Sequence, residues 1–393
     1  MKRALPILLL IAAACASGPS QPATAPVTMK IGTYSFDMGP SPVGVIPSAK
    51  LHDDARNKDL EISIDYPTRG GPFPVVVFSH GYGLSDHSYE PLISYWTSNG
   101  YVCIRPQHAD AGQIRDTSRD LITSAPPQQQ RRGSRSPQQQ QGVVVPLQQN
   151  NPAEQIWDKE REPQWQNRAM DVELVINSLD KIERDFPELA GKMDHEKIGV
   201  SGHGYGAFTA LLAGGLRTAS NPPISMRDPR IRAIVVFSPP GIAENRTITG
   251  QSFADLRIPV LYMTGTNDRG ANESENAAWR KGAFENSPAG DKYFVLIDGA
   301  RYASFTGQVG VFAIAAAQPM TQTDQYGRPI VQQPQAQQPG GLVFGNDRQI
   351  FGVAKMVSLA FWDGYLKNDT AARDQLQPAK LETSVSAVHV SSK

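Results

Sequence analysis

The sequence predicts an α/β fold with a mainly parallel, doubly wound sheet and helices on both faces. Short runs rich in valine and isoleucine recur along the chain between stretches with helical spacing. Several of these runs are almost continuously apolar, which is typical of strands buried on both faces of a parallel sheet. The predicted strands are Glu61–Tyr66, Pro74–Ser79, Tyr101–Arg105, Lys197–Ser201, Ile231–Ser238, Ile258–Thr264 and Lys292–Asp298.

Helical segments lie between or after these strands. Apolar residues at mixed helical spacing predict a helix over Arg168–Ile182, and a second helix is predicted over Gln349–Leu366. Because strands and helices alternate throughout, one α/β domain accounts for most of the chain. We place this domain at residues 46–380, followed by a tail at 381–393.

Two stretches crowded with glutamine and proline interrupt the pattern, at residues 124–152 and 318–341. Neither has helical or strand periodicity, so both are predicted to be disordered surface inserts. The chain of 393 residues carries 38 Lys+Arg and 38 Asp+Glu, and its formal net charge is zero. A neutral chain has no overall field that attracts nucleic acid or an anionic membrane. We therefore expect no nucleic-acid partner, and the oligomeric state stays open.

The first residues have the pattern of an export signal. Lys2 and Arg3 precede an apolar run that ends directly before Cys15. This run is too short to span a bilayer, which takes about 20 residues. Small residues leading to a cysteine resemble a bacterial lipobox. Residues 1–15 are therefore predicted to be a signal peptide with Cys15 as the lipidation site, which would hold the protein at the cell envelope.

The alternative is a plain secretory signal, which would leave the protein periplasmic or secreted. Residues 16–45 begin with a segment rich in Pro, Ala, Ser and Thr, and they are predicted to be a tether. In the lipid-anchored case the membrane is contacted only through the lipid.

Cys103 is the only cysteine besides Cys15, and it lies in a predicted strand. We expect it to be buried. A single remaining cysteine forms no intramolecular disulfide and no cysteine-based zinc cluster. The histidines have no spacing typical of metal ligands, so neither a metal nor a cofactor is predicted.

A glycine-rich turn joins a predicted strand to a predicted helix at Gly202-His203-Gly204-Tyr205-Gly206. It resembles the G-x-S-x-G nucleophile elbow of α/β-hydrolases, in which the central serine sits in a strained turn and the flanking residues must be small. Here the centre is Gly204. The frame of the motif is kept and the nucleophilic hydroxyl is absent.

Two later segments resemble the other triad positions of α/β-hydrolases. Asp268 follows the penultimate core strand, where this superfamily carries the triad acid. Tyr302 lies in Gly299-Ala300-Arg301-Tyr302-Ala303-Ser304-Phe305, which resembles G-A-x-H-x-x-F, so tyrosine stands at the position of the catalytic histidine. The order of elbow, acid and base positions matches that of the superfamily.

The segment Ser79-His80-Gly81-Tyr82-Gly83 resembles the H-G-x-G loop whose backbone N–H groups bind a developing oxyanion. The resemblance implies that the N–H groups of Tyr82 and Tyr205 form this hole, with His80 and His203 nearby as ligand-binding candidates. Together with Arg105–Asp110 and Phe361–Lys367, the motifs resemble dienelactone-hydrolase-like and platelet-activating-factor-acetylhydrolase-like esterases over roughly residues 50–375, apart from the inserts.

Two functional hypotheses follow from the substituted triad. The first is a catalytically inactive hydrolase homologue that binds a protein or an acyl, ester-like or anionic small molecule in the former pocket. The alternative is an active carboxylic-ester hydrolase that uses another group, for example a water activated by His203 or His108. Local structural roles are the expectation for His80, His87 and His108 if neither hypothesis uses them.

Overall fold

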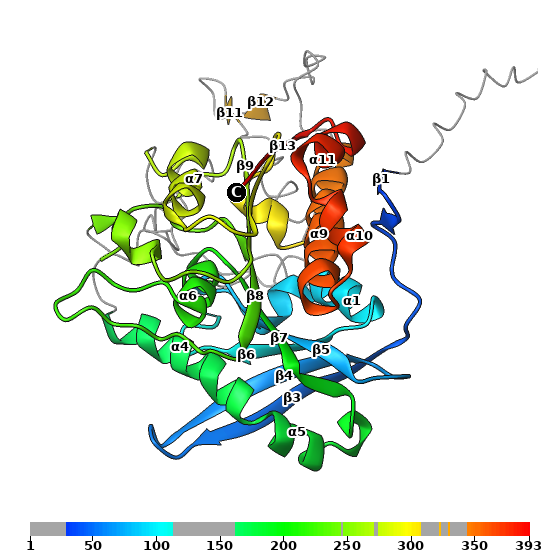
Figure 1. Ribbon diagram of the computed structural model, residues 1–393, viewed down its shortest axis with the longest axis vertical. Coiled ribbons are helices and arrows are strands. Elements are labelled where there is room, and N and C mark those ends of the chain that lie inside the picture. Colours follow the sequence, from blue (N-terminus) through cyan, green and yellow to red (C-terminus); the bar gives the residue numbers. More distant parts are fainter. Residues whose placement is uncertain are drawn as a thin grey trace, which may run out of the picture.

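A nine-stranded sheet lies at the centre of the computed structural model, which describes residues 29–112, 162–244, 247–270, 274–307, 322–323, 329–330 and 344–393 (Figure 1). The strand order is β13-β10-β9-β8-β7-β5-β6-β4-β3. The strands are β3 (Val43–Asp53), β4 (Lys58–Pro67), β5 (Phe73–Ser79), β6 (Val102–Gln107), β7 (Met193–His203), β8 (Ile231–Phe237), β9 (Val260–Gly265), β10 (Lys292–Ile297) and β13 (Val388–Ser392).

The central strands β6, β5, β7, β8, β9 and β10 run parallel to their neighbours. Strands β4 and β3 continue the sheet in antiparallel pairing at one edge, and β13 pairs antiparallel with β10 at the other. The mainly parallel sheet and all the predicted strands are confirmed. The sequence analysis did not predict β3 or β13.

Helices cover both faces of the sheet, as predicted (Figure 1). One face carries α4 (Glu162–Asn177), α5 (Leu179–Asp185), α6 (Tyr205–Gly214) and α7 (Ala277–Asn286). The other face carries α1 (Glu90–Ser98), α9 (Phe344–Leu366) and α11 (Pro378–Ser384), with α10 (Thr370–Gln375) beside α9. The short helices are η1 (Asp86–Tyr89), η3 (Pro187–Leu189), η5 (Gly250–Phe253) and η6 (Tyr302–Phe305).

Successive residues of each central strand enter two different cores. In β5, Val75 and Val77 pack in the core under α4 and α6, whereas Val76 and Phe78 pack in the core under α1 and α9. All four side chains are buried. Since neighbouring side chains of a strand point to opposite faces, a strand between two helical layers must be apolar throughout. This is the physical reason for the continuous apolar runs in the sequence.

The boundaries of the domain differ from the predicted ones. The segment predicted to be a tail contains most of α11 and all of β13, which pairs with Tyr293–Ile297 of β10. The predicted tether contains β1 (Lys30–Ile31), β2 (Tyr34–Ser35) and the start of β3, and Ile31 is buried. Both segments were misassigned because their strands are short or alternate with polar residues, which weakens the sequence signal.

The predicted helix over Arg168–Ile182 is two helices, because α4 ends at Asn177 and α5 begins at Leu179. The insert at 124–152 lies outside the described residues. The insert at 318–341 does so too, except for the antiparallel pair β11 (Gln322–Thr323) and β12 (Pro329–Ile330), which was not predicted. Residues 1–28, including Cys15, also lie outside the described part. No described helix is long and apolar enough to cross a membrane.

Strand β5 marks the point at which the order of the parallel strands reverses along the chain. It lies between β6 and β7, and Ser79 at its carboxyl end pairs with Gly202 of β7. The loop after β5 and the turn after β7 therefore leave the sheet side by side. Ligand sites of open α/β sheets form at such a switch point, and the predicted elbow and oxyanion loop both lie there.

Helix α6 approaches β5 so closely that only glycine fits at position 206. A Cβ atom on Gly206 would lie 1.9 Å from the backbone oxygen of Ser79. We expect Gly206→Ala to lower the free energy of unfolding by at least about 1–3 kcal/mol, because neither backbone has room to move. Urea denaturation measures this change.

The matched control is Gly282→Ala in α7, where the added Cβ meets nothing closer than 3.8 Å. Alanine is the better helix former by roughly 0.5–1 kcal/mol, so this variant is expected to be as stable as wild type or more so. Equal effects of the two substitutions would contradict the close approach.

Candidate functional site

Gly204 occupies the sharp turn between β7 and α6, with φ 56° and ψ −110°. Residues other than glycine are strained in this region of backbone space, typically by about 1–3 kcal/mol. The flanking glycines are required by space, since a Cβ atom on Gly202 would lie 2.2 Å from the oxygen of Gly206. The structure therefore has the backbone of a nucleophile elbow, with glycine at the position of the nucleophile.

Tyr302 lies directly over this turn. It begins η6 after β10, and its hydroxyl oxygen would be 1.9 Å from a Cβ atom placed on Gly204. Its ring also lies against that of His203, with centroids 4.0 Å apart and an interplanar angle of 34°. The elbow and the base position thus meet in space. Their two substitutions fit each other, because the tyrosine hydroxyl occupies the volume that any side chain at position 204 needs.

Asp268 lies beyond the end of β9 and is completely buried. Its Oδ1 forms an ion pair of 3.1 Å with Nη2 of Arg280, whose side chain is also completely buried, and its Oδ2 accepts a hydrogen bond of 2.7 Å from Thr264. Arg280 comes from α7 and also donates to the backbone oxygen of Ser238 at 2.8 Å. The acid of the triad position is therefore neutralised inside the protein by an arginine.

His203 is buried beside this pair. Its Nδ1 lies 2.7 Å from the hydroxyl of Tyr89, and its Nε2 lies 3.2 Å from the hydroxyl of Ser238. Desolvation, followed by the nearby charge of Arg280, lowers the pKa of His203 to about 3. The ring is therefore neutral at physiological pH, and both of its nitrogens face hydroxyl groups of the protein.

Two side chains accept hydrogen bonds from the backbone of the loop after β5. Gly81 donates its N–H to the Tyr89 hydroxyl at 3.1 Å, and Gly83 donates its N–H to Asp110 at 3.1 Å. Tyr82 in this loop and Tyr205 at the start of α6 are both buried, with ring centroids 6.1 Å apart. The structure thus places the two predicted oxyanion residues together. Their role as oxyanion donors stays a prediction.

His80 is buried in the same loop. Its Nε2 accepts a hydrogen bond of 3.1 Å from the backbone N–H of His108, and its Nδ1 lies 2.8 Å from the backbone oxygen of Gly81. A ring that accepts at Nε2 and donates at Nδ1 is neutral. Desolvation, with the charge of Arg168 second, lowers the pKa of His80 and agrees with this state. His80 therefore supports the loop, and its predicted role in ligand binding stays a prediction.

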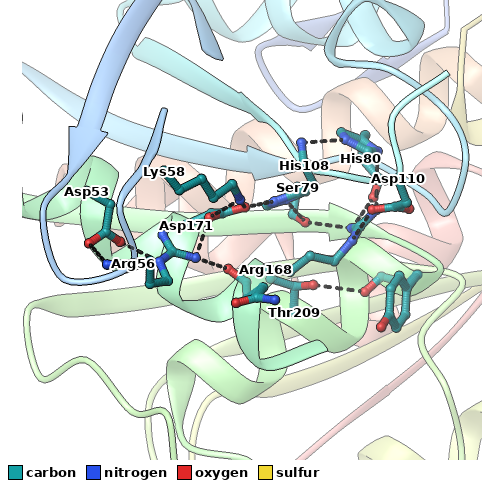
Figure 2. Close-up of polar contacts among 12 residues, drawn as sticks. Asp53, Arg56, Lys58, Ser79, His80, His108, Asp110, Arg168, Asp171 and Thr209 are labelled. Carbon is teal, nitrogen blue, oxygen red and sulfur yellow. Dashed lines mark hydrogen bonds and ion pairs between the residues drawn. The ribbon is translucent and has the colours of Figure 1, made fainter. Parts of the chain in front are cut away.

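A buried chain of polar contacts runs beneath the loop from β5 to α4 (Figure 2). The Ser79 hydroxyl lies 2.9 Å from Nε2 of His108, and Nδ1 of that histidine lies 2.9 Å from Oδ2 of Asp171. Asp171 also forms ion pairs with Arg56 at 2.7 Å and Lys58 at 3.0 Å. The sequence analysis considered Ser79 and His108 separately and did not connect them with Asp171.

The direction of each hydrogen bond in this chain follows from chemistry. Burial alone would raise the pKa of Asp171, but its hydrogen bond with His108 and the charge of Lys58 outweigh burial and hold the pKa at about 2. The ionised carboxylate only accepts, so His108 donates from Nδ1 and accepts at Nε2 from the Ser79 hydroxyl. Ser79 in turn accepts from Arg168 at 3.2 Å.

These distances equal those of a Ser–His–Asp triad, but the surroundings differ from those of a catalytic one. Ser79 has no exposed surface, and His108 and Asp171 are 1% exposed. Arg168 covers the serine while it forms a two-pronged ion pair with Asp110 and donates to the backbone oxygen of His80 at 2.8 Å (Figure 2). We assign this chain to holding β5, β6, α4 and the loop after β5 together.

The sequence analysis missed Tyr89, Arg168, Asp171 and Arg280 as parts of the site. Arg168 and Asp171 are three residues apart at the sheet-facing side of α4, where charged residues in an otherwise apolar stripe were a usable signal. Arg280 and Tyr89 had no such signal. Among the described residues, no group of three or more His, Cys, Asp or Glu side chains is arranged to hold a metal ion.

A surface cavity of about 220 Å³ lies at the other end of the strands, where the amino ends of the central strands meet solvent. It is lined in part by His195, Arg230 and Arg232, near the amino ends of β7 and β8. Gly204 follows the carboxyl end of β7, so this cavity is not part of the site described above.

The sheet order, the strained turn after β7 and the loop after β5 define an α/β-hydrolase fold. Residues 32–125 match the family model described as Chlorophyllase. The chain is also similar to Chlorophyllase-1 of Arabidopsis thaliana, with 32% identity over 73 residues, which cover 19% of this chain and 22% of that protein. The protein thus has the fold of α/β-hydrolases, and its residues 32–125 are similar to the chlorophyllase family.

These comparisons cover only the first part of the domain. The matched range contains β3 to β6, the loop after β5, His108 and Asp110, and it ends before Gly204, Asp268 and Tyr302. The likeness supports the predicted superfamily. It does not bear on whether the triad positions are catalytic, because the aligned segment spans about a fifth of the relative's length.

Replacing Asp171 tests the buried polar chain. Asp171→Asn removes the carboxylate that pairs with Lys58 and leaves Arg56 with Asp53 alone. Breaking a buried pair of this kind costs up to about 3–5 kcal/mol of unfolding free energy near pH 7. The folded-state pKa of Asp171 is lowered from 3.8 to about 2, so the stability it contributes is present above pH 4 and is lost as the pH falls toward 2. Urea denaturation at several pH values should show the difference between wild type and variant shrinking over that range.

The control is Asp185→Asn, which removes a carboxylate from an exposed pair with Lys181. Exposed pairs of this kind contribute roughly 0–1 kcal/mol. A difference that is small for Asp171→Asn, or that does not depend on pH below 4, would contradict the assigned role.

Proposed function

We propose that the protein is a catalytically inactive α/β-hydrolase homologue that acts by binding a ligand or another protein. The observation that carries this proposal is the fit of Tyr302 to Gly204, in which the tyrosine hydroxyl fills the space of the nucleophilic side chain. A site that had merely lost its serine would leave this space empty. Here the former base position fills it.

The state of Asp268 supports the same proposal. In a working triad the acid orients a histidine and stabilises its imidazolium form. Here both carboxylate oxygens already have partners, and the buried Arg280 supplies the positive charge. The acid therefore stabilises the fold around α7 and has no histidine to orient. A contact between Asp268 and a ligand finds no support, because the carboxylate is completely buried.

The alternative of an active esterase with an unusual catalytic group is not favoured by the geometry. His203 has a pKa of about 3 and both nitrogens near hydroxyl groups, so it is a poor base for activating water. His108 is buried between Ser79 and Asp171. Loss of a triad serine or histidine reduces turnover about a millionfold in a serine protease, so a hydrolase with these substitutions would be silent in ordinary assays.

An acyl or ester-like molecule is the proposed small ligand, in keeping with the resemblance to dienelactone-hydrolase-like and platelet-activating-factor-acetylhydrolase-like esterases. The space over Gly204 is filled by Tyr302, so such a ligand must bind against the exposed side of the tyrosine or displace it. Thermal stabilisation by acyl and sugar-ester panels measures this binding. The absence of any response would count against a small-molecule ligand and favour a protein partner.

Restoring the triad tests the loss of catalysis. Wild type is expected to show no turnover of p-nitrophenyl acetate. The double variant Gly204→Ser/Tyr302→His is expected to turn over, because the histidine removes the hydroxyl that excludes the serine.

Gly204→Ser alone is the control, and it is expected to be inactive and less stable because the serine Cβ overlaps the Tyr302 hydroxyl. Sustained hydrolysis by wild type that survives Gly204→Ala would overturn the proposal and place the catalytic group elsewhere.

We further propose that the protein is exported and attached to the bacterial envelope by a lipid at Cys15, as the sequence pattern predicts. Cys15→Ser should abolish incorporation of labelled palmitate and release the protein from the membrane fraction. Retention of the label in this variant would exclude Cys15 as the attachment site. A wild-type protein that takes up no label would favour a plain secretory signal.

A further inference from the structure

Tyr302 differs from the other predicted site residues in its exposure. Gly204, Tyr205, Tyr82, His80, His203 and Asp268 are all buried, whereas Tyr302 is partly exposed. Tyr302 therefore has more surface exposed to solvent than these residues have. The short helix η6, which Tyr302 begins, follows the carboxyl end of β10 in the chain.

The Tyr302 hydroxyl lies close to the place where a serine at position 204 would carry its oxygen. A serine at position 204 would carry its oxygen one bond beyond Cβ, and the tyrosine oxygen lies 1.9 Å from that Cβ position. The same oxygen would be 3.1 Å from a Cβ atom on Gly81, in the loop after β5. The base position of the fold thus delivers a hydroxyl to the place where the superfamily presents its nucleophile.

We propose that the Tyr302 hydroxyl is an acyl acceptor that takes one acyl group from an activated carboxylic ester. This inference rests on the proposed function, since a catalytically inactive site does not hydrolyse the acyl ester that it forms. The phenolic oxygen forms a bond to the acyl carbon, the bond from that carbon to the alcohol oxygen of the ester breaks, and the phenolic proton leaves with the released alcohol. The product is an acyl-tyrosine ester.

The reaction stops there because nothing in the described site activates water against the new ester. In a working hydrolase the histidine does this in the second half of the cycle. Here that position is Tyr302 itself, and the neighbouring His203 ring has Tyr89 at Nδ1 and Ser238 at Nε2. Asp268 is held by Arg280 and Thr264. The acyl group therefore remains on the tyrosine.

Competing hydroxyls near the site are less accessible. Ser79 is completely buried and lies between His108 and Arg168. Tyr89 is completely buried and accepts the N–H of Gly81. An ester that enters from solvent should therefore modify Tyr302 and leave these two hydroxyls unmodified.

The experiment mixes the full chain with p-nitrophenyl acetate and follows the release of p-nitrophenolate. We expect a burst of one equivalent per chain with no sustained turnover, and peptide mass spectrometry should find the acetyl group on Tyr302. Tyr302→Phe keeps the ring against His203 and removes only the hydroxyl, so it should lose the burst. The matched control is Tyr66→Phe on β4, another partly exposed tyrosine, which should keep it.

Gly204→Ala provides an independent test of position. The added methyl group cannot share the space of the tyrosine hydroxyl, so the hydroxyl is displaced while its chemistry is unchanged. A folded Gly204→Ala protein, checked by circular dichroism, should lose the burst. If this variant does not fold, the pair Tyr302→Phe and Tyr66→Phe decides the question.

The outcomes separate this inference from the proposed function. A wild-type protein with neither burst nor turnover overturns the acyl-acceptor role and leaves the inactive-homologue proposal standing. Acetylation of other residues with Tyr302 unmodified also overturns it. Sustained turnover by wild type overturns the proposed function itself, whatever residue carries the acyl group.

Discussion

The close approach of α6 to β5 is the constraint on which the site depends. A glycine at position 206 lets the helix start against the backbone oxygen of Ser79, and this contact forces the sharp turn at Gly204. The turn points position 204 toward η6, where Tyr302 stands. In a serine hydrolase the same geometry presents the nucleophile to its base. In this protein position 204 has no side chain, and the Tyr302 hydroxyl fills the space that a side chain would take.

Charge neutralisation shapes the interior around that turn. Asp268 is paired with Arg280, Asp110 with Arg168, and Asp171 with Arg56 and Lys58, and all three carboxylates are buried. A buried charge without a partner costs several kcal/mol, so removal of either member of a pair is expensive. The pair of Asp268 and Arg280 stands where a catalytic acid would need a histidine. The carboxylate that stabilises the fold by pairing with Arg280 is therefore not free to pair with a catalytic histidine.

Hydrogen-bond distances alone do not identify a catalytic triad in this fold. The chain of Ser79, His108 and Asp171 has both distances of a triad at 2.9 Å. What separates it from a working triad is the absence of exposed serine surface and the presence of Arg168 over the serine oxygen. Tyr302 is the opposite case, because it is partly exposed and its hydroxyl lies at the nucleophile's position.

The sequence by itself determined the fold class and the central strands, because continuous apolar runs have a local physical cause. It also predicts the three triad positions, and that assignment stays a prediction. It did not determine β13 or β3, whose short or alternating patterns have meaning only once a neighbouring strand is present. Only the tertiary structure decided the partners of Asp268, the tautomers of His80 and His108, and the overlap of Tyr302 with position 204. These depend on side chains far apart in the sequence, such as Arg280 and Asp171, and the approach of such groups follows from packing, which no local pattern encodes.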